Sequence, residues 1–163
     1  IAFQGKGVVS RIIRMWQRYP ISHVGVVINI DEMGRVMVME STSLNGKKGV
    51  QLNRLSKRVK EYGGIVHWFP LNTGTRDLLD TDAMQKFLWE QDGKKYDFWQ
   101  AIKAGMWLFR TRENGSEYFC SELVAGAWKA GGIIKPNTNI SEMTPEELCR
   151  KHWLYAKTFV RLN

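Results

Sequence analysis

Hydrophobic residues recur at intervals of three and four positions in four stretches of the chain, which is the spacing of an amphipathic helix. The predicted helices lie within residues 7–20, 81–91, 98–109 and 116–132, and Cys120 opens the last of them. Pro20 closes the first, and Gly131-Gly132 stops the last. Two shorter helices are expected, one over residues 54–62 and one that Thr144 caps, with Pro145 in its first turn.

Runs rich in β-branched residues predict the strands, which cover residues 23–30, 35–42, 65–71 and 154–162. The first two runs flank a four-residue turn at 31–34 and are expected to form a β-hairpin. Helices and strands are mixed without the strict alternation of βαβ units. The sequence therefore predicts an α+β fold built on an antiparallel sheet.

The composition is that of a folded globular chain. Its 163 residues predict one domain over 1–163, and 44% hydrophobic with 25% charged residues excludes a disordered or fibrous protein. No apolar run approaches the roughly 20 residues of a membrane-spanning helix, so a soluble or peripheral protein is expected. The chain starts at Ile1, which leaves a removed leader open.

The charge is strongly positive, with 24 Lys and Arg against 16 Asp and Glu, a net charge of +8. This balance favours an anionic partner, such as a cell-wall polymer, a membrane surface or a nucleic acid. No phosphate-binding loop, zinc-finger spacing or RNA-binding signature accompanies it, so no nucleic acid is expected. The plain interpretation is two solvated basic faces, formed by Lys6, Arg11, Arg14 and Arg18 and by Lys47, Lys48, Arg54, Lys57, Arg58 and Lys60.

Cys120 is the first candidate for chemistry. It stands at the predicted start of a helix, where free backbone N–H groups and the helix dipole favour a thiolate. The alternative is a small buried hydrophobe, which most free cysteines are. The other cysteine, Cys149, has metal-ligand spacing to His152, but no second pair lies near it in sequence, so no metal site is expected.

His23 is the second candidate, because it opens the predicted strand 23–30. A histidine on a strand that faces a cysteine at a helix start is the working arrangement of papain-like catalysis. Its far ring nitrogen then needs a polar partner that fixes the tautomer. Glu40, at the end of the neighbouring strand, is placed to reach it across the hairpin, and the alternative is an ordinary strand-end carboxylate.

Four strings of residues together resemble the permuted papain-like amidases, the YiiX-like relatives of the NlpC-type cell-wall hydrolases and of the lecithin–retinol acyltransferase group. The strings are SHVGVV at 22–27, EST at 40–42, GKKYD at 93–97 and YFCSELV at 118–124. In that family the histidine-bearing strand precedes the cysteine-bearing helix, the reverse of papain. The order His23, Glu40, Cys120 matches it, and the resemblance spans most of the chain.

The resemblance implies a papain-like fold in which an antiparallel sheet packs against the helix that carries the nucleophile. It further implies Cys120 as nucleophile, His23 as base and Glu40 as third member, with no cofactor. Tyr96 matches the family's Tyr-Asp position ahead of the nucleophile, which implies that it either lines the substrate pocket or helps to polarise the carbonyl. Ser41 and Thr42 are weaker candidates for the wall of the groove.

Three functions stay open on the sequence. The leading one is an amidase or peptidase acting on peptidoglycan stem peptides or a related amide. The second is a lipid acyltransferase or phospholipase that forms the same thioester. The third is a basic binding module without catalysis, in which Cys120 is only packed. Fast alkylation of Cys120 would separate the two enzymes from the binding module.

Overall fold

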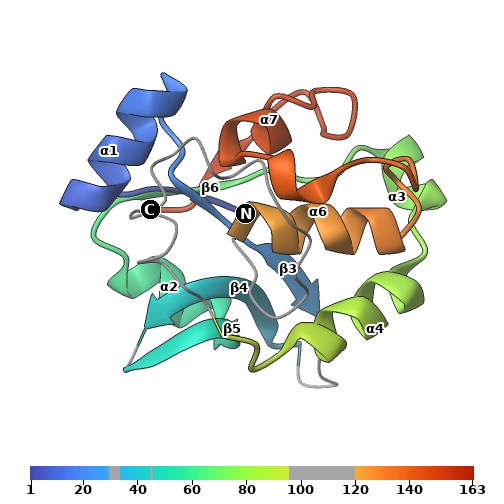
Figure 1. Ribbon diagram of the computed structural model, residues 1–163, viewed down its shortest axis with the longest axis horizontal. Helices are drawn as coiled ribbons and strands as arrows, with labels where there is room; N and C mark the ends of the chain where they lie inside the picture. Colours follow the sequence, from blue (N-terminus) through green and yellow to red (C-terminus); the bar gives the residue numbers. More distant parts are fainter. Residues whose placement is uncertain (30–33, 45, 96–119) are drawn as a thin grey trace.

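The computed structural model describes residues 1–29, 34–44, 46–95 and 120–163 (Figure 1). The strands are β1 (Ala2–Gln4), β2 (His23–Val24), β3 (Val26–Asn29), β4 (Val36–Leu44), β5 (Lys47–Arg54), β6 (Ile65–Trp68) and β7 (Val160–Arg161). The helices are α1 (Val8–Gln17), α2 (Leu55–Glu61), α3 (Thr73–Leu78), α4 (Thr81–Gln91), α6 (Cys120–Ala130), the 3₁₀ turn η2 (Ile140–Glu142) and α7 (Pro145–Cys149). The fold is α+β with antiparallel sheets.

Two sheets meet along one stretch of chain, residues 23–29. The first sheet has the order β2-β1-β6-β7 and the second the order β3-β4-β5. β2 pairs with β1 through Phe3 and His23, whereas β3 pairs with β4 through Val26 and Met39. The hairpin expected from the strands predicted over residues 23–30 and 35–42 is confirmed by the pairing of β3 with β4. One short segment therefore belongs to both sheets and changes partner at Gly25.

Gly25 allows β4 to approach this junction. A Cβ atom at this position would lie 2.9 Å from Val38 Cγ2, 3.1 Å from the Met39 carbonyl oxygen and 3.2 Å from Glu40 Cβ. Such distances are shorter than ordinary van der Waals contacts. Continuing the β3–β4 register places Glu40 opposite Gly25, so the missing side chain makes room for that glutamate.

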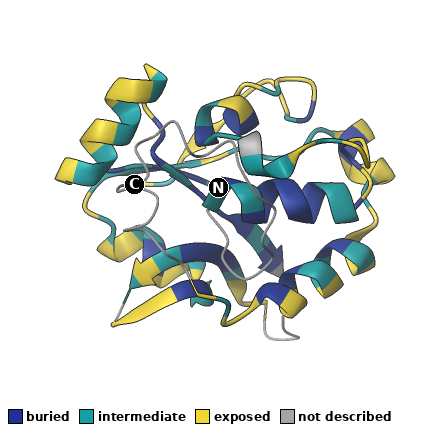
Figure 2. Ribbon diagram, viewed as in Figure 1, coloured by how far each residue is buried: buried dark blue, intermediate teal, exposed yellow. Residues whose placement is uncertain are grey.

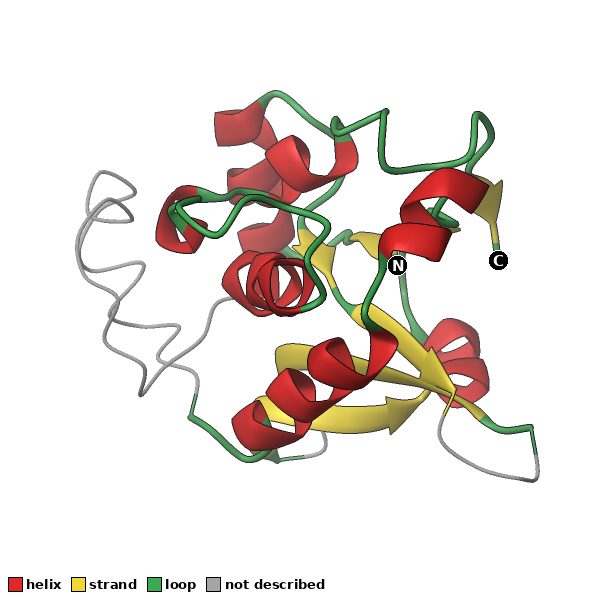
Figure 3. Cartoon of the chain, turned by 90° about the vertical axis from the view of Figure 1, so that its right-hand side faces the viewer, coloured by secondary structure: helices red, strands yellow, loops and turns green. Residues whose placement is uncertain are grey.

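The core lies between α6 and the sheets. Leu123, Val124, Ala125 and Ala127 are all buried, and α6 is mostly dark in Figure 2. Figure 3 views α6 nearly along its axis, with the β3-β4-β5 sheet beneath it. On another face, a Cβ at Gly126 would lie 2.4 Å from the Phe87 ring, so this glycine lets α4 pack closely against α6.

Most helix boundaries follow the sequence signals. In α4, the Asp80 side chain caps the helix by accepting from Ala83 N at 2.9 Å, and Met84 and Leu88 are buried as expected. α7 begins with the expected proline and has a capping box between Thr144 and Glu147. In the described ranges no helix is both long and apolar enough to cross a membrane.

Several elements differ from the sequence predictions. β1, β5, α3 and η2 were not expected, and the predicted strand 154–162 is reduced to β7 and an isolated bridge between Leu71 and Tyr155. The helix predicted over residues 98–109 lies outside the described residues.

Candidate active site

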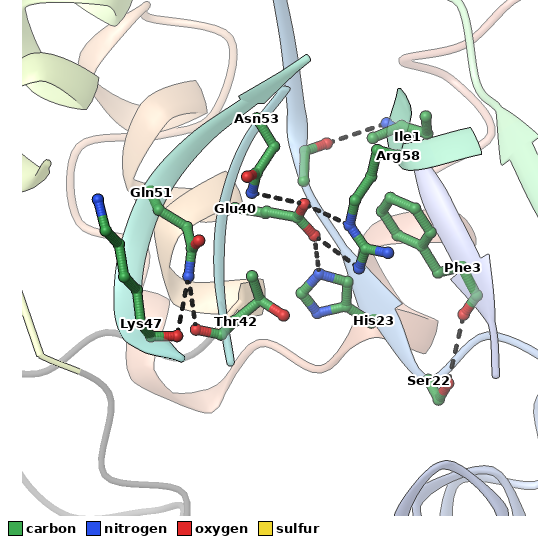
Figure 4. A network of polar contacts seen from close by, with 11 residues as sticks. Ile1, Phe3, Ser22, His23, Glu40, Thr42, Lys47, Gln51, Asn53 and Arg58 are labelled. Atoms are coloured by element: carbon green, nitrogen blue, oxygen red, sulfur yellow. Dashed lines mark hydrogen bonds and ion pairs between the residues drawn. The ribbon is translucent and has the colours of Figure 1, made fainter. Parts of the chain in front are cut away.

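His23 and Glu40 come together from the two sheets. His23 opens β2, held in register by Phe3 of β1, and Glu40 lies in the middle of β4. The His23 Nε2 and Glu40 Oε2 atoms are 2.7 Å apart (Figure 4). The glutamate side chain is fully buried and the histidine side chain is 17% exposed. The imidazole is therefore held at one nitrogen, and the other nitrogen is left for a second partner.

Among the described residues, two other side chains donate three hydrogen bonds to the buried Glu40 carboxylate. Asn53 Nδ2 donates to Oε1 at 3.1 Å, and Arg58 donates to Oε1 through Nε at 2.6 Å and to Oε2 through Nη2 at 3.2 Å. Burial by itself raises the pKa of this carboxyl, but the hydrogen bonds and charges of His23 and Arg58 outweigh it and lower the pKa to about 2. Glu40 is thus a carboxylate throughout the physiological range.

Arg58 is itself enclosed by aromatic rings. Its guanidinium carbon lies 4.7 Å from the centroid of Phe3 and 4.9 Å from that of Tyr62. The Phe3 ring also contacts the His23 ring, with centroids 5.1 Å apart. Cation–π contacts of this kind hold a guanidinium in place where it is shielded from water. His23, Glu40 and Arg58 therefore lie in one cluster, which Phe3 and Tyr62 pack against.

Cys120 supplies the second partner of the imidazole. It is the first residue of α6, and it lies close enough to His23 to raise the pKa of the imidazole. Burial lowers the pKa of His23, but the charge and hydrogen bond of Cys120, followed by those of Glu40, outweigh burial and raise the pKa to about 9. Because Nε2 faces Glu40, Nδ1 is the nitrogen left for the sulfur. The imidazole thus lies between the carboxylate of Glu40 and the thiol of Cys120.

The two cysteines have different surroundings. Cys120 is half-buried, whereas only 3% of Cys149 is exposed. Burial, and to a smaller extent the charge of Cys120, raises the pKa of the Cys149 thiol to about 12. Both cysteines are free. Cys149 therefore stays protonated at neutral pH and acts as a packed apolar residue.

The remaining candidates divide by position. Successive residues of β4 point to opposite faces, so Thr42 shares the face of Glu40 and Ser41 lies on the other face. The side chain of Ser41 is buried and Thr42 is half-buried. Thr42 is thus the better placed of the two to line a groove beside Glu40. Tyr96 lies outside the described residues.

Arg58 is the residue that the charge pattern concealed. The sequence assigned it to a solvated basic face, but it is 8% exposed and bonded to Glu40, so this interpretation is wrong for Arg58. The other five residues of that cluster are exposed. Leu55, Arg58, Val59 and Tyr62 follow the spacing of the inward face of a helix, which is the signal that marks Arg58 as buried.

The described residues contain no group of three or more His, Cys, Asp or Glu side chains that could hold a metal ion. What the site offers is a strand-borne imidazole hydrogen-bonded to an ionised carboxylate, with a helix-borne thiol near enough to raise the pKa of the imidazole. Such a line of groups can activate a sulfur nucleophile and pass a proton. No protein-family model matches this chain, and no curated protein matches it.

Proposed function

We propose that this chain is a cysteine hydrolase of permuted papain-like fold that cleaves an amide bond through a thioacyl-enzyme. One observation carries the proposal: the His23 imidazole is hydrogen-bonded to the buried Glu40 carboxylate and lies close enough to Cys120 for the cysteine to raise its pKa. The antiparallel sheets packed against α6, and the chain order His23, Glu40, Cys120, support the permuted arrangement.

The first half of the reaction forms the thioester. The proton of the Cys120 thiol passes to His23 before the attack, because the raised pKa keeps the imidazole protonated at neutral pH, and the sulfur then attacks the carbonyl carbon, whose oxygen takes up the electron pair. The backbone N–H of Cys120, at the start of α6, is one donor for that oxygen. The imidazolium then protonates the amine as the C–N bond breaks. Glu40 holds the ring in place and stabilises its positive charge.

The second half releases the acyl group. Water gives a proton to His23 and attacks the thioester carbon, and the Cys120 sulfur leaves and recovers its proton. The products are a carboxylic acid and the free enzyme. Peptidoglycan stem peptides are the substrate class that the resemblance implies, and the net charge of +8 suits an anionic cell wall.

Alkylation with iodoacetamide tests the nucleophile. Cys120 should react quickly at neutral pH and Cys149, buried with a pKa of about 12, should stay slow, as measured by mass spectrometry of the intact protein and its peptides. Equal and slow labelling of both cysteines would contradict the proposal and favour the binding module.

Turnover of peptidoglycan fragments, with short-chain phospholipids in parallel, tests the reaction. Cys120→Ala and His23→Ala should abolish turnover, whereas Glu40→Gln should keep measurable activity. In the wild type the upper limb of kcat/KM should lie near pH 9, where His23 loses its proton. Glu40→Gln should move this limb to lower pH, because the carboxylate that raises the His23 pKa is gone. Turnover of phospholipid alone would replace the amidase with a lipid enzyme.

A further inference from the structure

The helix α1 presents apolar side chains to solvent. None of its ten residues is buried. Val8, Ile12 and Met15 follow one another at helical spacing, and they are 73%, 47% and 76% exposed. Figure 2 shows exposed residues along most of this helix. An apolar stripe of this kind is normally turned toward the core, so its position at the surface requires another explanation.

The charged residues of α1 and of its C-cap are all positive. Arg11, Arg14 and Arg18 lie on one flank of α1, and the first 30 residues of the chain contain no Asp or Glu. The arginines and the apolar stripe line one surface groove of about 620 Å³. Within the described part of the chain, the buried Arg14 Nε has no hydrogen-bond partner. The groove thus combines apolar contact area with guanidinium donors, and no carboxylate comes from α1.

From this combination we infer that α1 is a docking surface for an anionic membrane. Val8, Ile12 and Met15 enter the boundary between headgroups and acyl chains, and the arginines bind lipid phosphates. A nucleic acid would not need an apolar stripe at the centre of the face. A second copy of the chain, paired through α1, would bring six guanidinium groups together and is disfavoured by repulsion. This inference goes beyond the proposed function and does not depend on it.

Sedimentation with lipid vesicles tests the inference. The wild type should pellet with vesicles of phosphatidylglycerol and phosphatidylcholine but not with phosphatidylcholine alone. The Val8→Asp/Met15→Asp and Arg11→Glu/Arg18→Glu variants should each lose at least tenfold in vesicle partitioning. Because all four side chains are exposed, thermal unfolding should show that both variants stay folded. Cys120→Ala should bind vesicles like the wild type, which separates this inference from the proposed catalysis.

Matched controls change the same chemistry elsewhere. Leu78→Asp replaces an apolar side chain that is 77% exposed on α3, and Lys57→Glu/Lys60→Glu reverses two exposed charges on α2. Both controls should bind like the wild type. Equal losses in controls and α1 variants, or equal binding to neutral and anionic vesicles, would overturn the inference. The inference would also be overturned if the protein did not bind vesicles but formed a dimer that the Met15→Asp substitution dissociates.

Discussion

At the residue scale, Arg58 offsets the free-energy cost of burying the Glu40 carboxylate. An unpaired charge in a protein interior is costly, and Glu40 is fully buried. The two hydrogen bonds from Arg58, one to each carboxylate oxygen, and the one from Asn53 stabilise the anion. Arg58 is therefore a positioning residue that acts on the base through Glu40.

The Arg58→Gln substitution tests this role. It should lower the free energy of unfolding by about 3 to 5 kcal/mol, because it leaves a buried carboxylate without its main counter-charge. It should also reduce kcat/KM. The control is Lys57→Gln on the same helix, where a 60% exposed side chain makes only a 3.9 Å surface pair with Glu61. That variant should stay within about 0.5 kcal/mol of the wild type, measured by urea unfolding. Equal effects of both substitutions would show that the buried pair has no special role.

At the element scale, the site depends on the close approach of β4 to the junction of β2 and β3. Gly25 is the residue that permits it, since a Cβ there would press on Val38 and Glu40. The sequence string SHVGVV therefore carries a packing requirement as well as the candidate base.

We predict that Gly25→Ala damages the site and the fold together. The added methyl group should push Glu40 from His23, reduce kcat/KM and cost about 1 to 3 kcal/mol of stability, the usual range for overpacking. Gly63→Ala is the control, because a Cβ at Gly63 would have no neighbour within 4 Å. Turnover assays and thermal unfolding of both variants measure the difference. Unchanged turnover and stability in the Gly25→Ala variant would mean that β4 can move away from Gly25 without loss of activity or stability.

The sequence predicts the long periodic elements well and the short ones poorly. The apolar periods of α4 and α6 extend over several turns, so both were predictable. α3 has only six residues, too few to show a period. β5 was missed because its lysines and Arg54 read as a charge cluster, although Val50 and Leu52 alternate with polar residues. The C-terminal run resembles a strand, but pairing depends on a distant partner, and only Val160 and Arg161 pair with β6.

The sequence allowed the candidate residues Cys120, His23 and Glu40 to be named, but not the residues that surround and position them. A cysteine at a helix start and a histidine at a strand start are local features that a sequence displays. The enclosure of Arg58 by Phe3 and Tyr62 joins β1 to α2, and no local pattern shows such a contact.

At the scale of the whole molecule, the ionised site links stability to pH. The pKa of Glu40 falls from 4.5 to about 2 on folding, and that of His23 rises from 6.5 to about 9. A lowered carboxyl pKa stabilises the fold fully above pH 4.5, and this contribution is lost as pH falls through 2. A raised imidazole pKa stabilises it fully below pH 6.5, and this contribution is lost as pH rises through 9.

We therefore predict a stability maximum between these limits, with an acid decline that Glu40 controls. The Glu40 contribution, taken from the shift in its pKa, is about 3 kcal/mol. Glu40→Gln should be less stable than the wild type at pH 7 but should lose less between pH 5 and pH 2. Glu61→Gln, which removes a carboxyl group that is 57% exposed, should follow the wild-type curve. Urea unfolding across pH 2 to 10 gives the comparison, and parallel acid limbs in all three proteins would refute the assignment.

The segment that changes sheets at Gly25 also ties the chemistry to the architecture. His23 belongs to one sheet and Glu40 to the other, so the hydrogen bond between them links the two sheets. The sheets cannot slide past each other without opening it. A substitution that loosens the contact between the two sheets, however far it lies from Cys120, should therefore weaken this hydrogen bond and with it the proposed proton transfer.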